Sequence, residues 1–352
     1  MLDWWERNER YVGLLALTGG FIFDWFTLRR IDLLTENLVM LIYIGVAMLS
    51  IVLISLVKEH LNGQGFLDEL FSFALQFSFG GLASAFFIFY SRSASFLASW
   101  PFLLLLIALL VGNEFFRHGY AHLAFRGTVL FICLFSYAIF SLPILVGRMG
   151  TGVFVASGLL SLLVIWLFSR LLKLITPSEH ASGRLGLFLG VLAFYFGITA
   201  LYFTNYLPPI PLALKDYAVA HSVAKQGSEY AIVREERTWA ERLTGRGTLH
   251  LRAGEPAFIY SAIFAPTKIS AGVAHHWQYF DVGRDRWISL GHVPYTLIGG
   301  ADGGYKGYTL KPTVYPGAWR VDIETERGQV IGRINFDIEI VTDEPSLVSI
   351  TR

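Results

Sequence analysis

Tyr202-Phe-Thr-Asn-Tyr-Leu-Pro-Pro-Ile-Pro-Leu-Ala-Leu214 divides this chain into two parts. Three of the four residues from Pro208 to Pro211 are proline, which lacks a backbone N–H and disfavours helical geometry in the residue before it. A helix that reaches this stretch therefore ends here. The rings of Tyr202 and Tyr206 suit the headgroup layer of a bilayer, because each has an apolar body and a polar end. The stretch predicts the end of the last membrane helix and the start of a separate domain.

The composition differs on the two sides of this stretch. Across 352 residues, 54% are apolar and only 16% are charged, which is more apolar than an ordinary soluble protein. The part after the stretch contains 16 basic and 16 acidic residues. A neutral domain without a basic run argues against nucleic acid as a partner. Cys133 is the only cysteine, so the chain contains neither an internal disulfide nor a cysteine-based metal site.

The first part contains seven apolar stretches of about the 20 residues that a helix needs to cross a bilayer. We therefore expect an α-helical membrane bundle of about seven transmembrane helices, with the lipid bilayer as its surroundings. Gly186 and Gly190 in the last stretch form a small-xxx-small pair, which favours close helix packing. The seven stretches are Tyr11–Leu28, Leu38–Val57, Leu70–Tyr90, Ala94–Asn113, Gly127–Gly147, Thr151–Arg170 and Leu185–Leu207.

The basic residues between these stretches indicate the orientation of the bundle. Eight lie on the side of the N-terminus and five on the other side, and basic residues favour the cytoplasm. This predicts a multi-pass protein of the bacterial inner membrane, with a cytoplasmic N-terminus and a periplasmic C-terminal domain. We expect residues 1–210 to form the membrane domain, residues 211–247 an irregular connecting segment and residues 248–352 the periplasmic domain.

In the last part the hydrophobic period changes to two, which is typical of half-buried antiparallel strands. Trp319, Val321 and Ile323 alternate with charged residues, and Trp277 and Trp319 occupy positions typical of a core. About seven short strands match the number in an immunoglobulin-like fold, so we expect an all-β immunoglobulin-like sandwich. The expected strands are Thr248–Arg252, Pro256–Ala265, Gly272–Val282, Trp287–Val293, Tyr305–Pro312, Trp319–Glu324 and Arg333–Ile340.

Four segments of this domain together resemble one known family. They are Val273-Ala-His-His-Trp277, Ile298-Gly-Gly-Ala-Asp-Gly-Gly-Tyr-Lys-Gly-Tyr308, Pro316-Gly-Ala-Trp-Arg-Val-Asp322 and Gly328-Gln-Val-Ile-Gly-Arg-Ile-Asn-Phe336. They are similar to the bacterial domain-of-unknown-function family 2914, over roughly Leu249 to Ile338. The resemblance implies a β domain that follows a helical membrane region in the cell envelope. It implies no catalytic residues.

Polar residues in the membrane part form one candidate site. Spacings of four residues place Glu114, His118 and His122 on one helix face, where carboxylate and imidazole groups suit zinc or proton transfer. An interfacial polar cap is the simpler interpretation, and we favour it. Asp24 is the one carboxylate well inside a predicted crossing, and an intramembrane charge is a functional candidate unless a partner such as Arg29 anchors it. Because we favour the polar cap over a metal site, we predict no metal and no cofactor.

The loop Gly299–Tyr305 and the nearby aromatic residues form the second candidate site. The small residues of the loop let the backbone approach a partner closely, and Asp302 between glycines can accept a hydrogen bond. A tight turn between strands is the simpler interpretation. We predict that this site binds an envelope protein or a glycan. Its expected residues are Trp287, Asp302, Gly303, Gly304, Tyr305 and Tyr308.

These observations leave three functions open. The first is a membrane-anchored protein whose β-sandwich recognises a ligand or an envelope partner, and we favour it. The second is a transporter or membrane enzyme that works through the polar residues of the helices. The third is a structural subunit of an envelope complex. The chain lacks the Gly-x-Ser-x-Gly and His-Glu-x-x-His motifs, so the sequence does not favour an enzyme.

Overall fold

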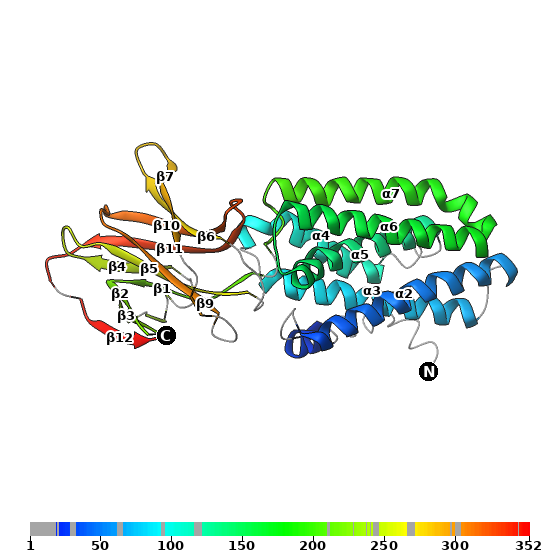
Figure 1. Ribbon diagram of the computed structural model, residues 1–352, viewed down its shortest axis with the longest axis horizontal. Coiled ribbons are helices and arrows are strands. Elements are labelled where there is room, and N and C mark those ends of the chain that lie inside the picture. The colour runs from blue at the N-terminus through cyan, green and yellow to red at the C-terminus, as the bar shows by residue number, and fades with distance from the viewer. Residues whose placement is uncertain are drawn as a thin grey trace. The chain divides into compact units, whose positions relative to one another are not determined.

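The computed structural model describes residues 19, 21–28, 33–61, 66–92, 96–115, 122–209, 212–227, 229–236, 238–239, 241, 246–265, 272–295, 298–299, 304–343 and 345–352. The chain folds into two compact units, and Figure 1 shows that one is helical and the other is built from strands. The first unit comprises Met1–Ser91 and Ser99–Leu207, and the second comprises Arg92–Ala98 and Pro208–Arg352.

Six long helices lie among the described residues of the first unit. Each overlaps one of the predicted apolar stretches, and the last helix ends at Phe203, before the proline cluster. The first predicted crossing, Tyr11–Leu28, lies largely outside the described residues, and its residues 21–27 are helical. The helices are α2 (Leu34–Leu61), α3 (Phe66–Arg92), α4 (Phe96–Phe115), α5 (Leu123–Val146), α6 (Thr151–Ile175) and α7 (Pro177–Phe203).

Five of these helices are long and apolar enough to cross a membrane, which indicates a membrane protein. They are α2, α3, α5, α6 and α7. Helix α5 is the most enclosed of the five, and it packs against α2, α6 and α7. The apolar segment of α4, Ser99–Gly112, is shorter than a full crossing.

Small residues bring α7 close to α5, as the sequence predicts. A Cβ atom added to Gly186 would lie 2.8 Å from Ala124 Cβ, and one added to Gly190 would overlap Thr128 Oγ1. Glycine at these positions therefore lets the two backbones approach at a distance that a larger residue excludes. The predicted close packing of the last helix is confirmed.

Twelve strands are present among the described residues of the second unit, arranged in three sheets. Their orders are β1-β5-β9-β8, β4-β11-β10-β6-β7 and β12-β3-β2. The strands are β1 (Ala213–Ala220), β2 (Ser222–Gln226), β3 (Glu229–Glu235), β4 (Arg246–Leu251), β5 (Ala257–Phe264), β6 (Val273–Asp281), β7 (Arg286–Tyr295), β8 (Ile298–Gly299), β9 (Tyr305–Lys311), β10 (Gly317–Thr325), β11 (Val330–Ile340) and β12 (Leu347–Thr351).

The five-stranded sheet buries one face, as the alternating pattern predicts. Trp277, Trp319 and Phe336 have no more than 1% of their surface exposed, and the two tryptophan rings meet edge to face. The prediction that Trp277 and Trp319 belong to the core is confirmed. Because successive side chains of a strand point to opposite faces, the polar residues between them share the other face.

Two features differ from the expectation. Strand β4 pairs with β11 in parallel, so the prediction that Thr248–Arg252 forms an antiparallel strand is wrong. The segment expected to be an irregular connection contains strands β1, β2 and β3. Strand β1 pairs with β5, and β3 pairs with both β2 and β12. The sequence does not predict these strands because their residues are mixed in polarity and show no clear alternation. In β2, for example, only Val223 is buried.

Candidate functional site

Polar side chains gather on the face of the five-stranded sheet that is opposite its tryptophan core. They come from the adjacent strands β7, β6, β10 and β11. In the register of the sheet, His276 lies opposite His292 on β7 and opposite Asp322 on β10. Gln278, Asp322 and Glu324 are buried although they are polar. This face combines charged and imidazole groups with low exposure to water.

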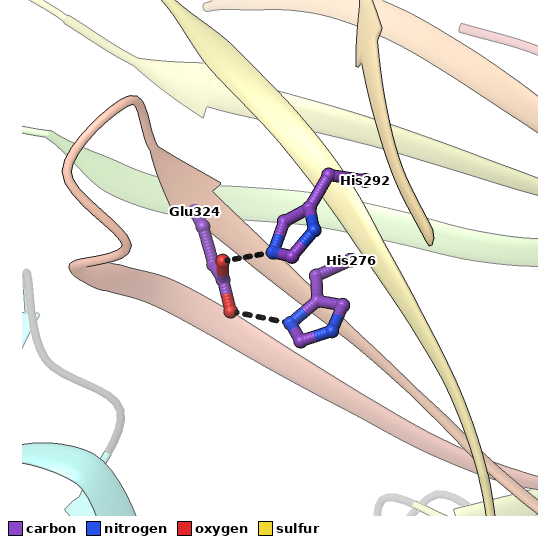
Figure 2. A group of neighbouring side chains, drawn as sticks. All are labelled: His276, His292 and Glu324. Carbon is purple, nitrogen blue, oxygen red and sulfur yellow. Dashed lines mark hydrogen bonds and ion pairs between the residues drawn. The ribbon is translucent and has the colours of Figure 1, made fainter. Parts of the chain in front are cut away.

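Two histidines and one glutamate form the most compact group on this face. Figure 2 shows both imidazole rings directed at the carboxylate of Glu324. His276 Nδ1 lies 3.0 Å from Glu324 Oε1, and His292 Nε2 lies 3.3 Å from Glu324 Oε2. The two rings stack with their centroids 3.8 Å apart. The side chain of Glu324 is 9% exposed and that of His292 is 56% exposed, so the group opens to solvent at His292.

A β-bulge in β7 brings the group together. The register shifts so that Gln278 pairs with Ser289, whereas His276 pairs with His292, three residues further along. In a regular strand, residues three apart point to opposite faces. Gly291 accommodates the bulge with φ +123°, a conformation that residues with a side chain rarely adopt. As a result Ser289 Oγ lies 2.8 Å from His276 Nε2 on the face that also carries His292.

A chain of charged contacts continues across the face from this group. Arg333 donates two hydrogen bonds to Asp322, of 2.6 and 2.7 Å, and these bonds raise the pKa of Arg333. Gln278 donates to Asp322 at 3.1 Å and accepts two hydrogen bonds from Arg320. The guanidinium of Arg320 lies 4.4 Å above the ring of Trp287. Trp287, which the sequence predicts as a binding residue, thus forms the far end of this network.

A separate buried polar cluster joins the core faces of two sheets. His275 Nε2 lies 2.9 Å from Ser261 Oγ on β5, and His275 Nδ1 lies 2.8 Å from Thr309 Oγ1 on β9. Burial lowers the pKa of His275 to about 3. Although serine and histidine lie within hydrogen-bond distance, both are fully buried, so no substrate reaches the hydroxyl. This cluster is structural.

A second histidine–glutamate group lies at the end of β3. Glu235 Oε1 lies 3.0 Å from His221 Nε2, and Glu235 Oε2 lies 2.6 Å from His250 Nδ1. Burial acts to raise the pKa of Glu235, but hydrogen bonds from the two histidines outweigh it, and the pKa is lowered. A pocket of about 110 Å³ adjoins Glu235 and His250.

The glycine-rich loop is not where the polar groups gather. Asp302 and Gly303 lie outside the described residues. Gly304 has φ +72°, and a Cβ atom added to it would lie 2.8 Å from the carbonyl oxygen of Ile263, so it serves a close backbone approach. Tyr305 pairs with Ile263 across the sheet, and Tyr308 packs against the ring of Tyr230. The structure does not bring these tyrosines to Trp287.

The polar candidates of the helical unit do not share one helix. Helix α4, which contains Glu114, ends at Phe115, and His122 has extended backbone just before α5. The side chain of Glu114 and all of His118 lie outside the described residues. Asp24 is half-buried in the helical segment 21–27. His122 therefore does not share a helix with Glu114, and the placement of His118 stays a prediction.

The helical unit contains a charged contact that the sequence does not predict. Arg126 on α5 is fully buried and donates a hydrogen bond to Glu179 on α7. Lys58 on α2 lies 4.0 Å from the same carboxylate. Glu59 accepts hydrogen bonds from the backbone N–H groups of Ser178 and Glu179 at the start of α7. These contacts tie three helices together, which is a structural role.

The sequence also does not predict the group formed by His276, His292 and Glu324. The three residues lie 16 and 32 positions apart, so they form no motif with a characteristic spacing. The alternation of β6 and β10 does place His276 and Glu324 on the polar face. His292 joins the group because of the bulge at Gly291. A single glycine within a strand is compatible with a bulge but does not by itself predict one.

Comparison with known proteins identifies the region that carries this face. Residues 270–338 match the family described as "Protein of unknown function (DUF2914)", which confirms the resemblance drawn from the sequence. All the residues of the polar face described above lie within this match. No curated protein matches the chain. A DNA-bound alkylpurine DNA glycosylase, AlkC, from Pseudomonas fluorescens aligns over 85% of this chain and 98% of its own, with 11% identity. Its TM-score of 0.20 is too low to support a common fold.

Proposed function

We propose that this protein is a membrane-anchored recognition protein whose β unit binds a ligand or an envelope partner on the polar face of its five-stranded sheet. The helices anchor this unit in the bacterial inner membrane through about seven crossings. The N-terminus is cytoplasmic, and the β unit, an immunoglobulin-like sandwich, is periplasmic. One observation carries the proposal: charged, imidazole and aromatic side chains converge on one face within the segment that matches the family.

The energetics of this face support a functional role. Taking a charge out of water costs several kcal/mol, and a buried ion pair is often no more stabilising than apolar residues of the same size. The sheet already has an apolar core around Trp277 and Trp319 on its other face. The buried Asp322 and Glu324 are therefore not needed to hold the strands together. Costly polar groups that the fold does not need are typical of binding sites.

The exposed rim of the face supports binding in the same place. Strand β7 is at the edge of its sheet, and Ser289, His292 and Pro294 are exposed along it. Near the start of β7, the guanidinium of Arg320 lies over the aromatic ring of Trp287. Aromatic rings beside polar groups suit glycans and protein side chains alike. The expected partner of this face is therefore an envelope protein or a glycan.

Site-specific photo-crosslinking in native membranes tests the proposal. A benzophenone amino acid at Pro294, on the exposed rim, is expected to capture a partner protein or glycan. The same group at Leu310, which is exposed on β9 of another sheet, serves as the control. Arg320→Ala and Trp287→Ala are expected to weaken the capture at Pro294 at least tenfold. Capture that is equal at both positions, or unchanged in both variants, would reject recognition by this face.

A further inference from the structure

We infer that His276, His292 and Glu324 form a binding site for one divalent transition-metal ion, with zinc as the ion that fits best. Zinc takes imidazole nitrogen and carboxylate oxygen ligands, and two histidines with one glutamate are a known set for zinc sites that keep a position open. The three ligand atoms all lie within 4.8 Å of one another. The following observations carry this assignment.

The distances between the ligand atoms fit a shared ion. Zinc lies about 2.0–2.2 Å from nitrogen and oxygen ligands, so two ligand atoms of a tetrahedral site are roughly 3.3 Å apart. The nitrogen–oxygen distances here are 3.0 Å for His276 and 3.3 Å for His292. Both histidines approach the same carboxylate, as Figure 2 shows. The two histidines contact different oxygens of that carboxylate, and all three ligand atoms lie within 4.8 Å of one another, so side-chain adjustment brings them around one ion.

The contacts of His276 place its Nδ1 beside Glu324, where the metal would bind, and its Nε2 beside Ser289. A metal-bound histidine usually donates its other N–H to a nearby acceptor, which fixes the ring. Ser289 Oγ lies 2.8 Å from His276 Nε2 and is placed to accept that hydrogen bond. Gln278 Nε2 lies 3.3 Å from His276 Nδ1. The same Nδ1 also lies 3.0 Å from Glu324 Oε1, so without metal it either donates to the carboxylate or accepts from the amide, and a metal ion would replace either contact.

The orientation of Gln278 is itself fixed by charged residues. Arg320 donates to its Oε1 at 2.9 and 2.6 Å, and Asp322 accepts from its Nε2 at 3.1 Å. The NH₂ group of Gln278 is therefore the part that faces His276. The polar network thus holds the surroundings of the site in place, as a metal site requires.

The site lies on strands and opens on one side. Glu324 and His276 come from the middle strands β10 and β6, and the bulge at Gly291 delivers His292 from the edge strand. Because His292 is 56% exposed, a fourth position on the ion faces water. An ion with three protein ligands and one open position can bind a further oxygen or nitrogen atom. The inference concerns the face of the proposed function, but metal binding does not depend on it.

Direct metal binding to the full-length chain in detergent tests the inference. The purified protein is stripped with a chelator and titrated with Zn²⁺ against a chromophoric competitor, and bound zinc is counted by mass spectrometry. We expect one zinc ion per chain. His292→Ala removes a ligand from an exposed position, so the fold stays intact, and zinc affinity is expected to fall at least 100-fold. Ser289→Ala is expected to weaken it 10–100-fold.

Matched controls come from the second histidine–glutamate group. His221→Ala and His250→Ala remove histidines that also contact a glutamate, and they are expected to leave zinc affinity unchanged. Wild type that binds no zinc, or His292→Ala that binds it as tightly as wild type, would overturn the assignment. Loss of binding in His250→Ala alone would overturn it too and place the ion at Glu235.

The result is separable from the proposed function. Photo-crosslinking at Pro294 that survives metal removal, together with a protein that binds no zinc, rejects the metal site alone. Tight zinc binding without any crosslink at Pro294 rejects recognition alone. Co²⁺ supplies a further readout, since a tetrahedral site gives visible absorption bands that disappear in Glu324→Gln.

Discussion

At the scale of single residues, buried His275 makes the β unit sensitive to acid. Its pKa is about 3 in the folded chain, because burial disfavours the charged ring, and about 6.5 in the unfolded chain. Between these values the unfolded state binds the proton and the folded state does not, so stability falls as the pH falls. From pH 7 to pH 5 this one residue lowers the free energy of unfolding by about 2 kcal/mol.

The variant His275→Gln isolates this effect. Glutamine keeps hydrogen-bonding groups near Ser261 and Thr309 but does not titrate, so its stability should depend less on pH by about 2 kcal/mol over the same range. Urea unfolding of both proteins at pH 7 and pH 5, followed by tryptophan fluorescence, provides the measurement. An identical pH dependence in the two proteins would contradict the assignment.

Gly291 carries a second prediction at this scale. Alanine at φ +123° is strained by roughly 1–3 kcal/mol. The added methyl meets no neighbour within 4 Å, so any loss comes from the backbone alone. Gly291→Ala should lower the free energy of unfolding by that amount and weaken zinc binding, because the bulge positions His292. Gly247→Ala, which meets only an ordinary contact at 3.5 Å, should change neither quantity measurably.

How far the sequence predicts single residues depends on periodicity. Trp277 and Trp319 are predictable as core because they alternate with polar residues on their strands. Trp287 lies under the guanidinium of Arg320, and its role as a binding residue stays a prediction. His292 is not predictable, since its face depends on a bulge that shifts the register of β7. Asp302 stays a prediction.

At the scale of elements, the contact between α5 and α7 depends on side-chain size. Gly190→Ala places a methyl group against Thr128 on α5, and overpacking of this kind costs roughly 1–3 kcal/mol. Gly197→Ala on the same helix meets nothing within 4 Å and should be neutral or slightly stabilising, because alanine favours helices. Thermal unfolding in detergent should separate the two variants by several degrees. Equal melting temperatures would show that α7 does not pack on α5 in this way.

The helices follow from the sequence more fully than the strands do. Long apolar stretches predict α2 to α7 because a bilayer requires both length and apolar character. Strands β1 to β3 are mixed in polarity, and the pairing of β1 with β5 and of β3 with β12 supplies what their own residues lack. The parallel pairing of β4 with β11 joins residues 89 positions apart, such as Arg246 and Asn335, which no local pattern records.

At the scale of the whole molecule, the orientation in the membrane is open to a direct test. Val282 lies in the turn between β6 and β7 and is 80% exposed, so Val282→Cys places a reactive thiol on the β unit. A maleimide that cannot cross membranes should label this thiol in intact spheroplasts. Native Cys133 is buried and should stay unlabelled, which makes wild type the control. Labelling only after lysis would place the β unit in the cytoplasm.

Strand β12 closes the small sheet against β3, and Arg352 exchanges two backbone hydrogen bonds with Tyr230. Pairing between segments more than 100 residues apart is slow to form, because a long loop must close first. Until residues 347–351 have left the ribosome, β3 retains an unpaired edge of the kind that promotes aggregation. A unit exported during synthesis would reach the far side of the membrane with that edge exposed, which makes it a natural client for a chaperone there.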